Sequence, residues 1–398
     1  MSLDFRQVQE QVRQLGEQAS GRQELLKNLR QWARDLLKEY SDQQPALREK
    51  VRRVVASHDP YLRCAVPPDP GVRPPEPLDA AQPLPPLPTR ASILAADGSQ
   101  IPVDRHAEVL YSLVNVGAIH MRLQSGEPPQ LTVRSQLLYD EEIYKNHRMI
   151  TDAFLARLRD VQERGILAEL AQSAAPPVIT FTDGPVELWG ADEGDGSGAP
   201  NQISQYLHTL QQLEQMGASV AGYVDKPTAD LVVRLLEVAV TPENELKEIK
   251  EQFPLNGVSD YALFQSLLHP GERSVVFAFQ SPQARQYKDG LALHFFYLNV
   301  GREGHPWLAR VDIPAWVAGD AQRLDVLQAV LVDQCRMMGS RPYPYLLHRA
   351  HETAVVTLDD REQVTQMIAL ELRRRHVEVG EVSQKQGSKD LSGRTRYP

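Results

Sequence analysis

A run of prolines divides this chain into parts that must fold differently. Ten of its 29 prolines lie within residues 67–89. Each proline lacks the backbone N–H that helices and central strands need, so the run is predicted to form neither. Residues 59–90 are therefore assigned to a semi-rigid linker of the polyproline type. A ligand for an SH3-type domain is the less common alternative.

The segment before the linker, residues 1–58, is predicted to be a helical arm. Its apolar residues recur at helical spacing, and Pro45 suits the first turn of a later helix. The arm is interpreted either as a hairpin with a solvated polar face or as a docking or dimerisation surface. The apolar positions are Phe5, Val8, Val12, Leu15, Leu25, Leu29, Trp32, Leu36, Leu47, Val51, Val54 and Val55.

The part after the linker alternates strand and helix patterns, which indicates an α/β domain. Short connections between the first strands predict antiparallel pairs and hence a mixed sheet. Residues 91–382 are assigned to this domain, residues 190–200 to a Gly/Asp-rich loop, and residues 383–398 to a flexible basic tail. Strands are expected at 92–97, 108–123, 130–138, 177–183, 218–224, 274–280 and 291–300, and helices at 146–172, 228–239, 323–338 and 359–375.

Composition excludes several classes of protein. The formal charge of −9 rules out coating nucleic acid by bulk charge, so any such contact needs local basic patches, metal ions or a partner. With only Cys64 and Cys335, a metal-binding cysteine cluster or a disulfide framework is excluded, and a reducing environment is expected. The chain shows no secretory signal and no apolar run of the roughly 18 residues that a membrane span needs. A cytoplasmic location is expected.

Two aspartates stand out because each follows an apolar strand pattern and precedes a glycine. They are Asp97 in Ala-Ala-Asp-Gly-Ser and Asp183 in Phe-Thr-Asp-Gly-Pro. Either one alone is more typical of an ordinary turn, and it is the occurrence of two in the same setting that makes a site an equal alternative. Two such carboxylates on neighbouring strands would repel each other unless a cation lay between them. Oxygen ligands of this kind suit Mg²⁺ or Mn²⁺, which in pairs promote phosphodiester hydrolysis.

Further ligands are expected from helices or from a histidine. Glu163 is the candidate on the helix before the Asp183 strand, and Asp160 and Glu169 compete with it. His351 lies between apolar flanks, where a buried core histidine is the alternative interpretation, and His348 and Glu352 are its possible substitutes. An imidazole beside oxygen ligands favours Mn²⁺. The chain lacks a P-loop motif, so it is not predicted to be a P-loop ATPase itself.

Taken together, these motifs resemble the NurA nucleases over roughly residues 88–376. The order and spacing of the matching stretches carry the resemblance. They are Ala-Ala-Asp97-Gly-Ser, Arg159-Asp-Val-Gln-Glu163, Val-Ile-Thr-Phe-Thr-Asp183-Gly-Pro, Gly222-Tyr-Val-Asp-Lys-Pro227, Phe296-Tyr-Leu-Asn299, Ala309-Arg-Val-Asp-Ile-Pro314-Ala-Trp, and Tyr343-Pro-Tyr followed by Ala350-His351-Glu352.

The resemblance implies an RNase H-like (Piwi-like) mixed β-sheet core flanked by helices, here with the N-terminal helical arm added. It also implies a Mn²⁺-dependent nuclease that degrades DNA 5′ to 3′ from its ends and cuts single strands. Such nucleases act as homodimers with a hexameric HerA-type ATPase that translocates DNA.

The resemblance assigns a role to individual residues. Asp97, Glu163 and Asp183 would be the metal-binding and catalytic carboxylates, with Mg²⁺ a possible substitute for Mn²⁺. His351 would be the late ligand, with Glu352 as its alternative. The further motif of Tyr223, Asp225 and Lys226 would lie near the cleft, with Lys226 contacting phosphate.

Two other hypotheses remain open on the sequence. The chain could be a catalytically inactive adaptor that tethers the ATPase, and metal binding would separate that role from an enzyme. It could instead be a ribonuclease or a transposase-like strand transferase, because the same metal pair serves those reactions. The arm, the linker and the loop at 190–200 fall outside the matched pattern, which leaves the dimer and the docking surface open.

Overall fold

The computed structural model describes residues 4–105, 107, 109–145, 147–190 and 201–376. The chain divides into two compact units, each described here by itself. The first comprises the chain up to Leu87 together with Gly222–Tyr343, and the second comprises Pro88–Ala221 together with the chain from Pro344. The predicted loop at 191–200 and the tail at 383–398 lie outside the described residues. No helix in the described ranges is long and apolar enough to cross a membrane.

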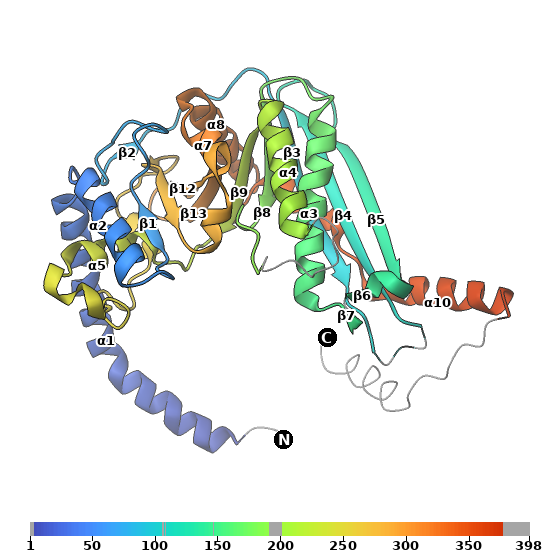
Figure 1. Cartoon of the computed structure of the whole chain (residues 1–398), viewed down its shortest axis with the longest axis horizontal. Coiled ribbons are helices and arrows are strands. Elements are labelled where there is room, and N and C mark those ends of the chain that lie inside the picture. Colours follow the sequence, from blue (N-terminus) through green and yellow to red (C-terminus); the bar gives the residue numbers. More distant parts are fainter. Residues whose placement is uncertain (1–3, 106, 108, 146, 191–200, 377–398) are drawn as a thin grey trace. The chain divides into compact units, whose positions relative to one another are not determined.

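The first unit is an antiparallel sheet covered by helices (Figure 1). Its sheet has the strand order β1-β11-β12-β13-β9, and the chain passes from one unit to the other within β9. Its elements are α1 (Phe5–Glu39), α2 (Gln44–Ser57), β1 (Cys64–Val66), β2 (Ala81–Gln82), β9 (Ser219–Asp225), α5 (Leu231–Val240), α6 (Asp260–Phe264), β10 (Arg273–Ser274), β11 (Phe277–Gln280), β12 (Leu293–Asn299), β13 (Leu308–Pro314), α7 (Ala315–Ala318) and α8 (Ala321–Met337).

The end of α1 and the helix α2 contribute to the core of this first unit, whereas the apolar residues in the first half of α1 are exposed. Leu36 of α1 and Val51 of α2 are buried with α5 and the aromatic residues of β11 and β12. The proline-rich residues 59–90 contribute the short strands β1 and β2, which pair with β11 and β10. The prolines follow these strands instead of interrupting them, so no ladder N–H is lost.

The second unit has a mixed sheet between helices, and residues 219–221 of β9 belong to it beside β8. Its strand order is β8-β3-β4-β5, with β3 parallel to β8 and the other neighbours antiparallel. This order is RNase H-like, which confirms the predicted fold class. The elements are β3 (Ser92–Ile101), β4 (Tyr111–Arg122), β5 (Gln130–Tyr139), β6 (Tyr144–Lys145), β7 (Arg148–Met149), α3 (Asp152–Ala171), β8 (Val178–Asp183), α4 (Gln202–Gln215), α9 (Tyr345–Ala354) and α10 (Leu358–Arg374).

Helices α3 and α9 cover opposite faces of this second sheet. A Cβ at Gly98 would meet α3, whereas a Cβ at Gly117 would meet α9. Gly117 lies opposite Asp97 and Gly98 lies opposite Val116 in the β3–β4 register, and side chains alternate between faces along a strand. The sequence patterns predicted α3 but gave no helix at α9.

Helix α9 lies directly on the sheet because β4 has a glycine at the contact. A Cβ at Gly117 would lie 2.9 Å from both the carbonyl oxygen of Ala350 and the nitrogen of Ala354. The end of α9 is also held by hydrogen bonds. Ser99 Oγ and Asn115 Nδ2 both donate to the Ala354 carbonyl oxygen, the latter over 2.8 Å.

We therefore predict that Gly117→Ala destabilises the protein by about 1–3 kcal/mol, because the new methyl group forces α9 off the sheet. Urea unfolding measures the change. The matched control is Gly165→Ala in α3, where a Cβ meets nothing within 4 Å. That control should be neutral or stabilising, because alanine favours a helix interior. Equal stability of both variants would contradict this account of α9.

Candidate active site

The two predicted aspartates lie next to each other on adjacent parallel strands. The pairing of β3 with β8 runs from Ser92–Val178 to Ala96–Thr182, and Asp97 and Asp183 are the next residue on each strand. The prediction that Asp97 ends its strand is wrong, because β3 continues to Ile101. It continues because β4 pairs with it along its whole length, whereas β8 ends at Asp183. Among the described residues of the second unit, β3 therefore has no strand partner on its β8 side beyond this point.

Asp97 is held by two hydrogen bonds that fix its carboxylate. Its Oδ1 accepts the backbone N–H of Gly98 at 2.8 Å, and its Oδ2 lies 2.7 Å from Nδ1 of His351 on α9. The side chain of His351 is 63% exposed, so it is not the core histidine of the alternative interpretation. The geometry brings Asp97 and His351 together although they are 254 residues apart.

Glu163 on α3 reaches the same strand from the other face. A Cβ at Gly98 would lie 2.9 Å from Glu163 Oε1 and 2.5 Å from Cγ of Arg159. Gly98 is thus required for the close approach of this helix. Burial raises the pKa of Glu163 well above its ordinary value. The charges of Asp160 and Asp97 add to the rise, and Arg159 opposes it.

The guanidinium of Arg159 places a positive charge within this acidic group. Its Nη2 lies 3.0 Å from Asp160 Oδ1, and its Nε lies 3.3 Å from Glu163 Oε1. Burial also raises the pKa of Asp160, although Arg159 opposes the shift. The sequence analysis named Arg159 only as the first residue of the stretch that ends at Glu163 and assigned no role to it.

The competing candidates have other partners. Glu169 forms an ion pair with Arg134 of β5 at 2.6 Å. Glu352 is half-exposed on α9 and pairs with Arg349 and with His348. His351 and Glu352 are neighbours on α9, and the structure places His351, not Glu352, against Asp97.

The donor set suits a hard divalent cation. Carboxylate oxygens with one imidazole are ligands for Mg²⁺ or Mn²⁺. Burial disfavours the negative charge of Glu163, and such a cation would favour it. In the ranges that the structure describes, no group of three or more His, Cys, Asp or Glu is arranged closely enough to enclose an ion.

The further motif at the end of β9 lies in the first unit. Tyr223 is buried, and its hydroxyl lies 3.6 Å from Sγ of Cys335, so it serves the core. Asp225 Oδ1 accepts the indole N–H of Trp307 at 2.7 Å. The ammonium of Lys226 lies 3.7 Å from the centre of the same indole ring. Asp225 and Lys226 thus form one cluster with Trp307, in which Lys226 is exposed and the other two residues are half-buried.

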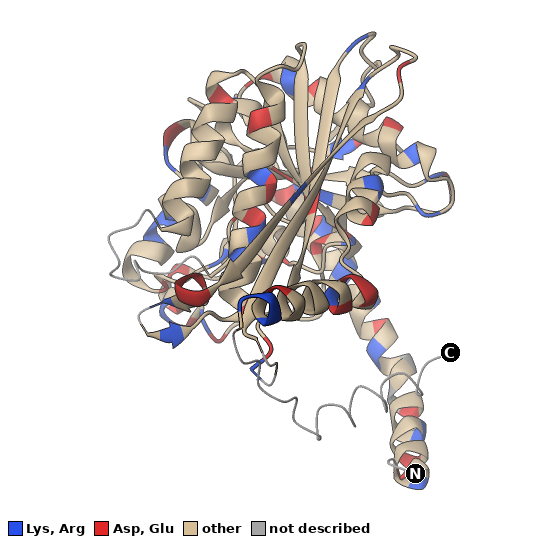
Figure 2. Ribbon diagram, turned by 90° about the vertical axis from the view of Figure 1, so that its right-hand side faces the viewer, with Lys and Arg blue, Asp and Glu red and all other residues tan. Residues whose placement is uncertain are grey.

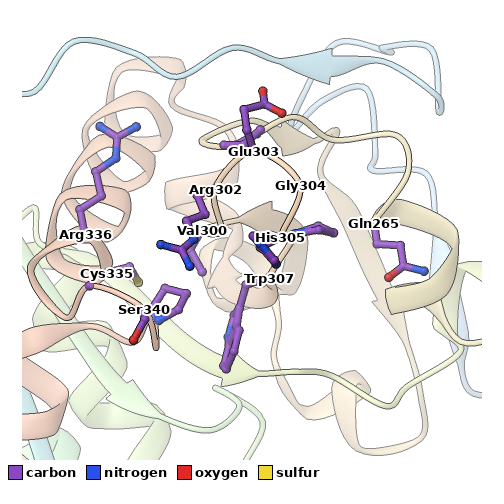
Figure 3. A pocket seen from close by; sticks show the side chains of 15 residues that line it. Gln265, Val300, Arg302, Glu303, Gly304, His305, Trp307, Cys335, Arg336 and Ser340 are labelled. Atoms are coloured by element: carbon purple, nitrogen blue, oxygen red, sulfur yellow. The ribbon is translucent and has the colours of Figure 1, made fainter.

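A cavity of about 680 Å³ in the first unit adjoins this cluster (Figure 3). It lies between the turn after β12 and the end of α8, and Arg302 points into the space between them. The turn is tightly built, since a Cβ at Gly301 would lie 2.4 Å from the carbonyl oxygen of His305. Trp307 also lines the cavity, which connects it with Asp225 and Lys226.

Comparison with known proteins identifies the family. The profile of the NurA domain family matches residues 91–356, which is more than half of the chain. The chain belongs to the NurA family. No match was found among curated proteins.

Three solved structures match this chain at low sequence identity. The NurA nuclease from Sulfolobus solfataricus is 12% identical, with a TM-score of 0.50 over 74% of this chain and 88% of that one. A NurA structure with manganese is 9% identical, with a TM-score of 0.38 over 72% and 91%. The catalytic domain of human Endonuclease V is 12% identical, with a TM-score of 0.31 over 83% and 99%. The first of these shows the fold alone.

The raised pKa of Glu163 predicts a pH-dependent effect of Glu163→Gln on stability without metal. Because the folded state holds the proton more tightly than the unfolded state, wild-type stability falls as pH rises above the ordinary value near 4.5. The glutamine variant lacks this loss. It should therefore melt at a higher temperature than wild type at pH 7 in chelator, and the two should converge below about pH 4.5.

Glu169→Gln on the same helix is the control, because Glu169 is exposed and paired at the surface. It should change the melting temperature little at either pH, since exposed ion pairs contribute little. If the Glu163→Gln variant melts below wild type at pH 7 in chelator, burial does not destabilise the ionised carboxylate of Glu163.

Proposed function

We propose that this NurA-family protein is a metal-dependent deoxyribonuclease that hydrolyses phosphodiester bonds. The observation that supports it most is the adjacency of Asp97 and Asp183 at the end of the β3–β8 pairing, with His351 bonded to Asp97. These two aspartates would provide carboxylate oxygens for a metal ion at the point where β8 ends.

Asp97 and Asp183 would hold Mn²⁺ or Mg²⁺, with Glu163 or His351 completing the site. When bound, a pair of such ions supplies an activated water and stabilises the leaving oxygen of the phosphodiester. The ions would also offset the repulsion between DNA phosphates and a chain with a formal charge of −9.

The residues of the chain prepare the site for this chemistry. The Gly98 N–H and the His351 ring each bond one oxygen of Asp97, which fixes the direction of its remaining lone pairs. Arg159 balances the charge of Glu163 and Asp160, so that the acidic group tolerates burial. When an ion binds to these carboxylates, the guanidinium of Arg159 must move away from them or contact them together with the ion.

The substrate would be DNA, degraded 5′ to 3′ from ends and cut within single strands. Lys226 would contact a backbone phosphate. Its exposure and the flat indole of Trp307 beneath it support this role, because cationic and aromatic groups together suit single strands.

An inactive adaptor for an ATPase is the second candidate. It is favoured by Arg159, which already neutralises the carboxylates that an ion would need. Calorimetric titration with Mn²⁺ separates the two roles, because an adaptor should bind no ion at this site.

Asp97→Asn and Asp183→Asn should each fold normally and lose cleavage of end-labelled DNA in Mn²⁺, because each removes a charged ligand. Assays on single- and double-stranded DNA, labelled at either end, measure the rate and the polarity. His351→Ala should lose about 10–100-fold, as expected for a residue that orients a ligand.

Glu352→Gln is the matched control for these variants, since Glu352 lies on the same helix as His351 and pairs at the surface. It should cleave at the wild-type rate. Wild-type cleavage by Asp97→Asn or Asp183→Asn, or undiminished wild-type cleavage in chelator, would rule out this site as the source of activity.

A hexameric HerA-type ATPase is the proposed partner, because a translocating ring would deliver DNA that this acidic chain attracts weakly. Cleavage by the chain alone should be slow, and the ATPase with ATP should stimulate it strongly. A comparison of rates with ATP, with a non-hydrolysable analogue and without the ATPase measures the effect. Equal rates in all three would contradict delivery by translocation.

A further inference from the structure

The cavity of about 680 Å³ in the first unit is formed without any of the carboxylate residues (Figure 3). Every residue that lines it belongs to the first unit. Its main walls are the turn at 300–307, which follows β12, and the end of α8 with the chain that comes after it. Pockets of roughly 300–1,000 Å³ hold small organic ligands, so this cavity is large enough for one nucleotide.

The turn that forms one wall is held in shape by its own hydrogen bonds. Asn299 is buried, and its Oδ1 accepts the backbone N–H groups of Gly301 at 3.0 Å and of Trp307 at 3.2 Å. Arg302 and His305 exchange backbone hydrogen bonds of 3.2 and 2.9 Å across the turn. These bonds fix the points from which Arg302 and Trp307 extend. A ligand would therefore meet a wall that it does not have to order.

The distribution of charge shows why an anion would need a local site. Basic and acidic residues are interspersed along the ribbon, as the blue and red segments of Figure 2 show. With a formal charge of −9, the chain as a whole does not attract anions. Binding of an anionic group thus depends on basic side chains that gather at one place.

The cavity gathers two exposed arginines, Arg302 of the turn and Arg336 of α8. Within the described residues, neither guanidinium forms an ion pair. Glu303 also lines the cavity, but its carboxylate points away from Arg302 and Trp307 (Figure 3). Burial raises the pKa of Asp333, one turn before Arg336, and Arg336 opposes the shift. Both guanidinium groups can therefore donate to one ligand, and their planar geometry suits phosphate.

The rest of the lining is largely apolar and includes one flat aromatic ring. Trp307 is half-buried, and its orientation is fixed because its indole N–H donates to Asp225 over 2.7 Å. Aromatic rings of this kind stack on nucleobases whatever the sequence. A ligand that uses the whole cavity would thus carry an anionic group and a flat, weakly polar ring. The apolar lining residues are Pro270, Val300, Pro306, Trp307 and Pro342.

The pair of arginines favours the phosphate of a nucleotide over a phosphate inside a strand. A phosphate monoester carries about −1.5 to −2 charges at pH 7, which two guanidinium groups can balance. A phosphate within a strand carries a single charge and continues into neighbours on both sides. A single nucleotide, or the last one of a strand, matches both the charge and the volume of the cavity.

We propose that this cavity binds a nucleoside 5′-monophosphate, with its phosphate on Arg302 and Arg336 and its base against Trp307. Two sources share this chemistry, namely a free nucleotide and the 5′-phosphorylated end of a DNA strand. The biological source rests on the proposed function, since hydrolysis from an end would start at such ends and release such nucleotides. Binding itself requires neither metal nor the carboxylates.

Calorimetric titration with thymidine 5′-monophosphate tests the site. The full-length Asp97→Asn protein in chelator should bind it saturably at one site per chain. Adding Arg302→Gln with Arg336→Gln should raise the dissociation constant by about tenfold or more, because charged hydrogen bonds to the phosphate are lost. The matched control, Arg13→Gln with Arg52→Gln, removes two exposed arginines that pair within their own helices. It should bind as tightly as the parent.

Comparison of ligands tests the assigned chemistry. Thymidine and inorganic phosphate should each bind at least about tenfold more weakly than the nucleotide, because each occupies only part of the cavity. Oligonucleotides with a 5′-phosphate or a 5′-hydroxyl, otherwise identical, distinguish the two sources. Tighter binding of the phosphorylated strand assigns the cavity to strand ends. Equal binding of the two strands, beside tight binding of the mononucleotide, assigns it to free nucleotides.

Three results would overturn the inference. One is the lack of saturable binding of thymidine 5′-monophosphate in chelator. The second is an unchanged dissociation constant in the double arginine variant. The third is binding of inorganic phosphate as tight as that of the nucleotide. These results leave the proposed function intact, because DNA cleavage by wild type and its loss in Asp97→Asn are measured separately.

Discussion

The parallel pairing of β3 with β8 is the constraint on which the proposed site depends. Its register sets Asp97 beside Asp183, and its end at Ala96 and Thr182 leaves the aspartates where the ladder stops. A shift of one residue would turn one carboxylate to the opposite face. The long antiparallel pairing of β3 with β4 keeps Asp97 inside a strand, so that its backbone is fixed on one side while its other side is open.

Two glycines let helices approach this point from both faces. Gly98 admits the side chains of Arg159 and Glu163 from α3, and Gly117 admits the backbone of α9, which carries His351. The buried Glu163 is costly to ionise, and Arg159 offsets part of that cost. The cluster of Asp97, Asp183 and Glu163 is therefore acidic and partly neutralised by Arg159. It lies where β8 ends.

The sequence predicted much of this unit, because Asp97, Asp183 and the α3 periodicity are local signals. It did not predict that β3 continues beyond Asp97, because polar residues such as Ser99 and Gln100 belong to a strand only when β4 supplies their partners. α9 was missed because its register depends on contacts with Gly117, Ser99 and Asn115. The choice of His351 over Glu352 likewise rests on a contact between residues 254 apart. The packing of the N-terminal helices with strands more than 200 residues later has no local signal at all.

The proposed site requires Asp97 and Asp183 to share a divalent ion. Anomalous scattering at the manganese edge, from crystals of the protein soaked in a Mn²⁺ salt, measures this most directly. We expect a peak within coordinating distance of both carboxylates in wild type and none there in Asp183→Asn. A well-occupied peak elsewhere, with no density between the two aspartates at saturating Mn²⁺, would contradict it.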